Sequence, residues 1–152
     1  MESRYTIKGS LRRAARLAAV QLLYQIEQSE IETTDAFAEF EKSIDLEKNN
    51  EKKNKIKVDF DFLRKILNGA KQRKNEIDKC IQKYLAKKWS IEKLPLILKA
   101  ILQLSLYEIF FEKIPRPVVI NEYIEITREF FQEPEVAFVN GFLDNAEILE
   151  VF

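Results

Sequence analysis

The stretch LPLILKAILQLSLYEIFF, residues 94–111, decides the fold, because its apolar residues cover nearly the whole circumference of a helix. A helix that is apolar on all sides lies in a protein core or crosses a membrane. Three polar residues interrupt this one, namely Lys99, Gln103 and Glu108. In a membrane span these side chains would lie in hydrocarbon, at a high cost in free energy. We therefore predict a buried central helix in a water-soluble protein, surrounded by amphipathic helices.

Length and composition favour an all-α fold. The 152 residues suit one domain, and the chain has only three glycines and four prolines and no alternating strand pattern. Its one cysteine, Cys80, shares a helix face with Ile77 and Ile81, which is typical of a core residue. A single cysteine fits a reducing cytoplasm, and the start MESRYTIKGS lacks the apolar segment of a signal peptide. We expect a cytoplasmic protein.

Helical spacing of apolar residues predicts five further helices. They cover about residues 10–27, 34–44, 59–88, 118–131 and 134–149. Ser10 and Asp59 are expected to cap two of them, and Gly69 is expected to loosen or bend the third. Residues 1–9 are interpreted as a basic arm and the polar segment 46–58 as an exposed loop.

Charge is balanced overall but unevenly distributed. The chain has 25 basic and 25 acidic residues. Residues 1–20 and 42–74 are net basic, whereas residues 121–152 are strongly acidic. Such asymmetry is compatible with binding of a polyanion on one face of the protein.

Three arginines mark the first predicted helix. Arg12, Arg13 and Arg16 fall within an arc of about 100° around the helix axis. Their fork-shaped donors suit phosphate groups. The pattern leaves two interpretations open, contact with RNA or DNA and an ordinary solvated helix face.

Aromatic and basic residues also gather at the end of the long predicted helix. Tyr84, Lys87, Lys88 and Trp89 are close in sequence there. Bases of single-stranded RNA stack on aromatic rings while cations bind the backbone. Core aromatics flanked by lysines with exposed amino groups are an equally good interpretation.

The sequence carries no recognised catalytic motif. The glycines Gly9, Gly69 and Gly141 form no phosphate-binding loop, and the absence of histidine excludes Cys/His metal sites and histidine-activated nucleophiles. We expect no enzymatic activity, no metal and no cofactor.

The C-terminal half carries motifs of a known family. LSLYEI at residues 104–109, IPRPVVINEYIEI at residues 114–126 and FVNGFLD at residues 138–144 occur in the order and spacing of the NusB family of bacterial transcription antitermination factors. RRAARLAAVQLLYQ, residues 12–25, resembles the arginine-rich first helix of that family. The resemblance spans the chain and is weakest in the charged loop.

The resemblance implies an all-α fold of two packed three-helix bundles with six to seven helices in one domain. The expected bundles cover about residues 10–88 and 90–152. It also implies binding of the single-stranded boxA element of ribosomal RNA transcripts, as a heterodimer with the small-subunit ribosomal protein NusE. Other Nus factors and RNA polymerase would be indirect partners, no membrane is implied, and a homodimer is left open.

Site residues follow from the same resemblance. The expected RNA contacts are Arg12, Arg13, Arg16, Tyr84, Arg116 and Phe138. The expected partner contacts are Tyr24, Leu98 and Lys99.

Four further motif residues are interpreted mainly as structural. Asn121, Glu122 and Asn140 would tie two helices together, and Gly141 would permit close approach. The functional alternative is that these residues shape the RNA surface. Gln103 stands where the family commonly has an arginine.

Two other functions are kept as alternatives. NusB-like domains occur in some ribosomal RNA cytosine methyltransferases, so the chain could be such a domain. It could also be a helical module that binds only protein. RNA binding with and without NusE separates these possibilities.

Overall fold

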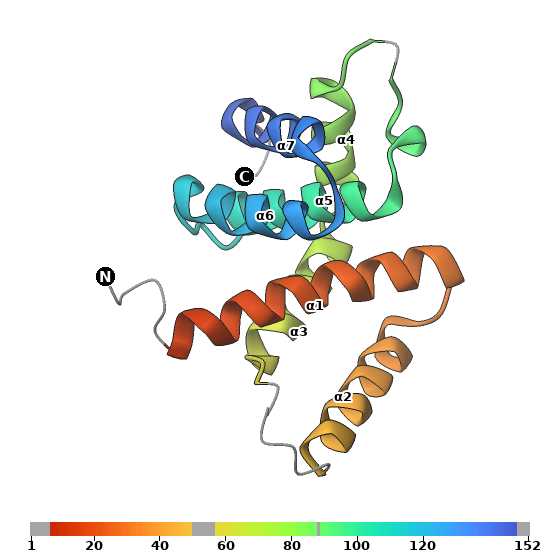
Figure 1. Cartoon of the computed structure of the whole chain (residues 1–152). Coiled ribbons are helices and arrows are strands. Elements are labelled where there is room, and N and C mark those ends of the chain that lie inside the picture. Colours follow the sequence, from red (N-terminus) through yellow and green to blue (C-terminus); the bar gives the residue numbers. More distant parts are fainter. Residues whose placement is uncertain (1–6, 50–56, 88, 149–152) are drawn as a thin grey trace. The chain divides into compact units, whose positions relative to one another are not determined.

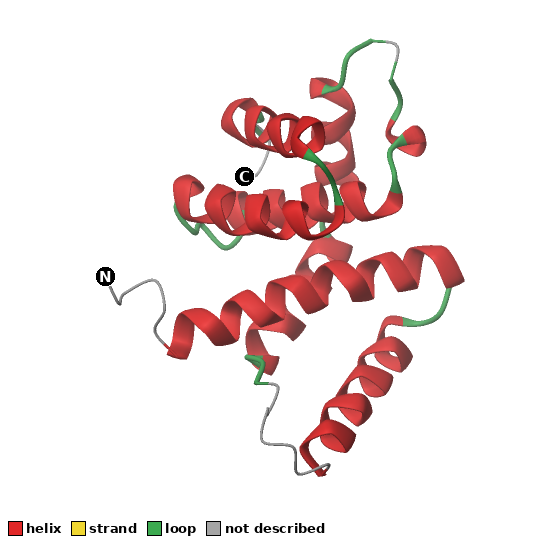
Figure 2. Ribbon diagram, in the orientation of Figure 1, coloured by secondary structure: helices red, strands yellow, loops and turns green. Residues whose placement is uncertain are grey.

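The protein forms only helices in the part that the structure describes. This structure, a computed structural model, describes residues 7–49, 57–87 and 89–148 (Figure 1). Coloured by secondary structure, these residues show helices and loops only (Figure 2), which confirms the predicted all-α class. The elements are α1 (Ile7–Ser29), α2 (Thr33–Asn49), α3 (Phe60–Gln72), α4 (Lys74–Tyr84), the short 3-10 helix η2 (Ile91–Lys93), α5 (Leu96–Phe110), α6 (Arg116–Phe130) and α7 (Glu133–Asn145).

Helix α5 is the central helix that the sequence predicts. Leu98 and every residue from Ala100 to Ile109 are buried. The helix contacts α4, α6 and α7, and these contacts cover the middle of the helix. Burial of each large apolar side chain contributes about 1.5–3 kcal/mol, so α5 supplies much of the core. No helix in the described ranges is long and apolar enough to cross a membrane.

The polar side chains of α5 have partners inside the core. Gln103 donates a hydrogen bond from Nε2 to Oδ1 of Asp78 at 2.8 Å, and Lys74 forms an ion pair with the other carboxylate oxygen of Asp78 at 2.7 Å. Glu108 is fully buried and accepts a hydrogen bond from the hydroxyl of Tyr123 at 2.6 Å. Buried polar groups cost free energy unless they are hydrogen-bonded, and these bonds meet that requirement. The neutral Gln103 therefore has a structural role that fastens α4 to α5.

The ends of α1 and α2 differ from the prediction. α1 begins at Ile7 instead of Ser10, so Ser10 is not its N-cap, and α2 continues to Asn49, into the segment predicted as a loop. Helical backbone bonds can continue through polar residues because charged side chains remain hydrated on a helix surface. The other residues of the expected arm and loop, 1–6 and 50–56, lie outside the described residues.

The long helix predicted from residue 59 is wrong as a single element. It divides at Arg73, which has φ −100° and ψ 19° between α3 and α4. Gly69 is not the break: it lies within α3, where a Cβ atom would come within 2.5 Å of the ring of Tyr107. That ring is held because its hydroxyl donates to Glu112 at 2.6 Å and it stacks on Phe111. Gly69 therefore makes room for a packed aromatic side chain.

Prolines and a capping box organise the two last helices. Pro115 precedes α6, so Arg116 and Pro117 of the predicted turn are helical, in the first-turn position that proline favours. The Gln132 backbone N–H donates to the Glu135 carboxyl group at 3.2 Å, one bond of the capping box that begins α7. α7 ends at Asn145, earlier than the predicted Leu149, and Leu149 lies outside the described residues.

The chain divides into two compact units, residues 1–63 and 64–152. The first contains α1, α2 and the first turn of α3, and the second contains the remaining helices. By compactness the division falls within α3, whereas the family architecture predicts bundles that meet near residues 88–90. That bundle boundary stays a prediction.

Candidate nucleic-acid interface

In the first unit, two of the three arginines lie over one aromatic ring. The guanidinium carbon of Arg12 is 4.3 Å from the ring centroid of Phe62, and that of Arg16 is 5.1 Å away. Phe62 is buried in the first turn of α3. A cation over a ring face is stabilised by about 0.5–1 kcal/mol where it is exposed, and by more where it is desolvated. The ring of Phe62 therefore makes cation–π contacts with two arginines of α1.

Asp59 links the arginine helix to α3. Its Oδ1 accepts the Phe62 backbone N–H at 3.0 Å, which confirms the predicted cap. Its Oδ2 lies 3.9 Å from Nε of Arg12, and its own N–H donates to the Leu11 carbonyl at 3.2 Å. Asp59 therefore fixes the start of α3 against α1 and places a carboxylate beside Arg12.

The three arginines differ in exposure. The side chain of Arg12 is 37% exposed, although its Nε is buried and has no hydrogen-bond partner among the described residues. Arg13 is partly exposed, whereas Arg16 is only 4% exposed. An anion can therefore reach Arg12 and Arg13 directly, while Arg16 contributes mainly to packing. The sequence places all three on one arc but does not distinguish these roles.

In the second unit, Tyr84 and Phe138 belong to one aromatic cluster. Tyr84, at the end of α4, meets Phe142 edge-on with ring centroids 6.2 Å apart, and Phe138 lies 5.7 Å from the same ring. Phe142 is buried, while Tyr84 and Phe138 remain half-buried. Lys83 places its amino group 5.5 Å from the Tyr84 ring. The buried ring fixes two partly accessible rings, which suits base stacking.

The guanidinium group of Arg116 forms hydrogen bonds within the protein. Its Nη1 donates to the carbonyls of Leu143 and Ala146 at 2.7 and 3.0 Å, and its Nη2 contacts Glu147 at 3.2 Å. These carbonyls belong to the end of α7, where the last turn lacks partners within the helix. A cation there also complements the helix dipole. Arg116 therefore caps the C-terminal end of α7. Its position in the IPRP motif does not reveal this role.

The expected partner-contact residues are found in different surroundings. In the first unit, Tyr24 of α1 is half-buried. In the second unit, Leu98 is only 5% exposed and Lys99 is partly exposed. Tyr24 and Lys99 can therefore meet a partner directly, whereas Leu98 can act only through the helix that it stabilises.

The structural interpretation of the motif residues needs correction. Asn121 and Asn140 are exposed, so burial does not require a partner for them. A Cβ atom at Gly141 would meet nothing within 4 Å, so Gly141 does not permit close approach of another helix. Glu122 is partly exposed. Helical periodicity cannot tell which faces of α6 and α7 remain uncovered.

Cys80 is a core residue, as predicted. It is 5% exposed, and its thiol donates to the Glu147 carbonyl at 3.6 Å. Burial raises the pKa of this thiol to about 11, so it is protonated at neutral pH and is a poor nucleophile. Among the residues that the structure describes, no group of three or more His, Cys, Asp and Glu side chains is arranged to hold a metal ion.

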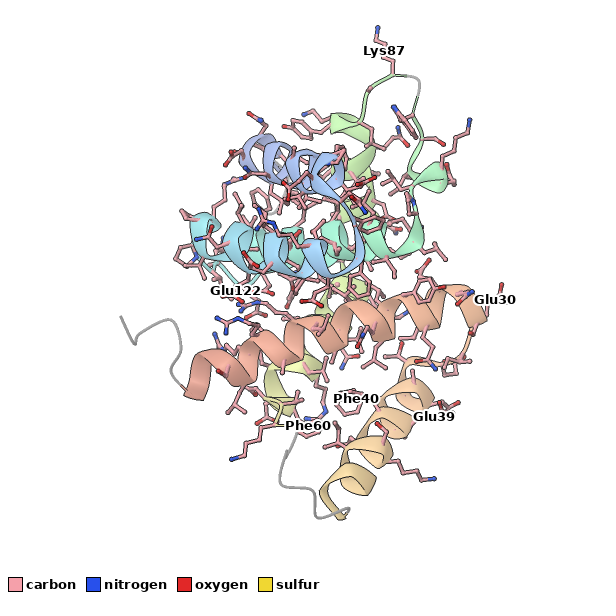
Figure 3. All side chains as sticks on the ribbon, viewed as in Figure 1. Glu30, Glu39, Phe40, Phe60, Lys87 and Glu122 are labelled. Atoms are coloured by element: carbon pink, nitrogen blue, oxygen red, sulfur yellow. The ribbon has the colours of Figure 1, made fainter. Side chains whose placement is uncertain are left out.

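Sequence reasoning missed Phe62 and the ion pair of Asp59. Phe60, at the start of the same helix, packs against Phe37 with ring centroids 6.2 Å apart. It also packs against Phe40 at 6.1 Å, and Figure 3 shows Phe40 and Phe60 beside each other. The spacing of Phe62 from Ile66, four residues later and fully buried, was the available signal. The stacking of arginines on Phe62 depends on tertiary contacts and had no signal in the sequence.

Together these features define a class of protein: an all-helical binding protein with two partly exposed arginines on one helix and an aromatic cluster in the other unit. The family model described as "NusB family" matches residues 13–147. This chain belongs to the NusB family.

The similarity to individual relatives agrees with membership of this family. The chain is 37% identical over 135 residues to the transcription antitermination protein NusB of Clostridium novyi, covering 88% of this chain and 96% of that protein. It is 38% identical to the protein of the same name from Caulobacter vibrioides, covering 88% and 89%. These coverages include both compact units.

Solved structures give the same result. The chain is similar to T. maritima NusB with a TM-score of 0.70 and 35% identity, covering 88% of this chain and 87% of that one. It is also similar to a chain in a solved complex of the antitermination factors NusB and NusE with double-stranded RNA. That similarity has a TM-score of 0.72 and 26% identity, covering 91% and 96%.

Proposed function

We propose that this chain is a transcription antitermination factor that binds the single-stranded boxA element of ribosomal RNA transcripts together with the ribosomal protein NusE. It acts as a binding adaptor in the cytoplasm and catalyses no reaction. Further Nus factors and RNA polymerase are reached through the assembled complex. Family membership and the names of the relatives support this proposal.

The observation that carries the proposal is the pair of accessible arginines on α1. Arg12 rests on Phe62, so its guanidinium is already oriented, and Arg13 is partly exposed beside it. A held arginine loses less side-chain entropy when a phosphate binds. Arg12 and Arg13 therefore bind the RNA backbone, while Arg16 supports them.

The aromatic cluster of Tyr84, Phe138 and Phe142 makes the second contribution to RNA binding. Tyr84 and Phe138 are held by Phe142 and remain partly accessible, so each can accept an unpaired base. Stacking on an aromatic ring contributes about 1–3 kcal/mol per base. Arg116 acts on RNA only indirectly, by stabilising the end of α7, the helix that carries Phe138.

Tyr24 and Lys99 are the partner contacts in this proposal, and Leu98 supports the helix beneath Lys99. Asn121, Asn140 and Gly141, which are exposed, are available to a bound macromolecule and not to the core. Either NusE or the RNA strand can cover them.

Fluorescence anisotropy of labelled boxA RNA, titrated with the protein in the absence and presence of NusE, tests the proposal. A scrambled RNA of equal length and composition is the control. We expect tighter binding of boxA, a further gain with NusE, and a log–log salt slope of about −2 to −3.5 for three to five neutralised phosphates.

Equal affinity for both RNAs, with no gain from NusE, contradicts specific boxA binding. Capture of NusE without any RNA binding supports the protein-only module instead. A methyltransferase domain is less well supported, because the chain matches 96% of the length of a relative named as an antitermination protein.

A further inference from the structure

Trp89 is exposed to an unusual degree for its type. Its exposed fraction is 48%, and Val118, at 45%, is the other large apolar side chain exposed to this extent among the described residues. Tryptophan carries a large aromatic surface that proteins usually cover. The proposed RNA contacts do not include Trp89, so its exposure still needs an explanation.

The backbone around Trp89 is firmly held. Its N–H donates to the Ala86 carbonyl at 2.9 Å, which closes a tight turn after α4. Gln82 holds the turn on both sides, since its Nε2 donates to the Trp89 carbonyl at 3.2 Å and its Oε1 accepts the Ile91 N–H at 2.9 Å. One amide side chain of α4 thus anchors the residue. The backbone of Trp89 is therefore already ordered before a ligand binds, which lowers the entropy lost on binding.

The sequence on either side of Trp89 is net basic, which favours binding of a polyanion. Lys79, Lys83 and Lys87 are all exposed, and Figure 3 shows Lys87 at the tip of the connection after α4 with its side chain directed away from the ribbon. Between residues 79 and 93 the sequence has five lysines and one glutamate. Lys88, one of the five, lies outside the described residues.

The exposed indole and the exposed lysines favour one kind of ligand over another. A purely apolar protein groove would leave several lysines desolvated, at a cost in free energy. An unpaired nucleotide offers both a ring to stack on the indole and a phosphate for the lysines. The end of α4 also carries Tyr84, with the amino group of Lys83 over its ring, so a second aromatic ring and a cation stand five and six residues before Trp89 in the sequence.

We propose that Trp89 stacks an unpaired base of bound single-stranded RNA, with Lys83 and Lys87 binding the flanking phosphates. The strand thereby extends past Tyr84 onto the turn between α4 and η2. This inference rests on the proposed RNA binding and adds a base contact to it. Because every base has a π-face, the contact raises affinity with little sequence preference.

Trp89 is the only tryptophan of the chain, so intrinsic fluorescence reports on it directly. Unlabelled boxA RNA is titrated into the full-length protein, with and without NusE. Free N-acetyltryptophanamide corrects for absorption by the RNA. We expect the emission to be quenched along the same isotherm as the anisotropy of labelled RNA.

The two assays separate the possible failures. RNA binding by anisotropy with unchanged tryptophan emission overturns this inference and leaves the proposed function intact. No RNA binding in either assay overturns both. A spectral shift caused by NusE alone, with no further change on adding RNA, assigns Trp89 to a protein contact and also overturns the inference.

Variants give an independent test. Trp89→Ala should weaken RNA binding about tenfold, which is within the range for loss of one stacked base. Trp89→Phe should retain most of the affinity, whereas Trp89→Leu should behave like Trp89→Ala. Val118→Ala is the matched control, because it removes an equally exposed apolar side chain and should leave the affinity unchanged. Equal affinities of Trp89→Leu and the wild type contradict stacking.

Discussion

The two units use the same pairing of an arginine with an aromatic ring in opposite ways. In the first unit Arg12 lies over Phe62, and its side chain is 37% exposed. In the second unit Arg116 lies over Phe110 at 5.2 Å, but its donors are occupied by the last carbonyls of α7 and by Glu147.

An arginine in a recognised motif is therefore not by itself a phosphate ligand. What matters is whether its donors are already used within the protein. The side chain of Arg12 is 37% exposed and its ion pair with Asp59 is long, at 3.9 Å, whereas Arg116 makes three hydrogen bonds within the protein. We therefore propose that Arg12 binds RNA and that Arg116 stabilises the end of α7.

The largest expected effect is the loss of stability in Arg116→Ala. Two carbonyls at the end of α7 would lose a charged donor, and the free energy of unfolding should fall by about 2 kcal/mol. Thermal unfolding followed by circular dichroism measures this. Arg128→Ala, which removes exposed ion pairs to Glu125 and Glu133, is the control and should change stability by less than about 0.5 kcal/mol. Equal losses in the two variants would show that Arg116 does not close α7.

The second effect is on RNA affinity and concerns Arg12→Ala. We expect boxA binding to weaken about tenfold, equivalent to about 1.4 kcal/mol. The free energy of unfolding should change by less than about 1 kcal/mol, because the ion pair with Asp59 is long and partly exposed. Anisotropy titrations beside melting curves provide both values. A large fall in stability with unchanged affinity would reverse the roles assigned to the two arginines.

A smaller effect should follow from Phe62→Leu. Leucine keeps an apolar side chain but removes the ring that orients Arg12, so RNA affinity should fall about threefold as more side-chain entropy is lost on binding. Phe60→Leu in the same helical turn is the matched control, since Phe60 packs against Phe37 and Phe40. Both variants should lose about 1 kcal/mol of stability. If both weaken RNA binding equally, the effect is general loosening and not loss of the platform.

The smallest expected effect is a gain in RNA affinity in Asp59→Asn. Asp59→Asn keeps a side-chain oxygen that can cap α3, but it removes the negative charge 3.9 Å from Arg12. RNA affinity at low salt should therefore rise about twofold and the gain should shrink as salt screens the charge. Weaker binding by this variant would mean that Asp59 positions Arg12 more than it competes with phosphate.

The sequence predicts the central architecture well because it depends on local pattern. The all-round apolar surface of residues 94–111 could be satisfied only by burial, and Leu98 and residues 100–109 are buried. The division at Arg73 was not predicted, because Ala70 and Ile77 lie two helical turns apart and the polar run 71–76 between them also fits the solvated face of one continuous helix. The position of Gly69 in α3 likewise makes sense only once Tyr107 is seen beside it.

The candidate site is less predictable than the fold. Helical spacing correctly places Arg12, Arg13 and Arg16 on one helix, but their different exposures depend on Phe62 and on burial that no spacing encodes. For Gly141 the sequence argument gave the wrong role, since the space above it is open. Periodicity identifies which residues share a face, and only tertiary contacts decide what that face meets.

The most direct test of the central claim is the salt dependence of boxA binding for the wild type, Arg12→Ala and Arg116→Ala. Each phosphate contact to a single strand contributes about 0.7 to the log–log slope. We predict a slope that is shallower by about 0.7 for Arg12→Ala and unchanged for Arg116→Ala. A shallower slope for Arg116→Ala, with that of Arg12→Ala equal to the wild type, would contradict the assignment of the two arginines.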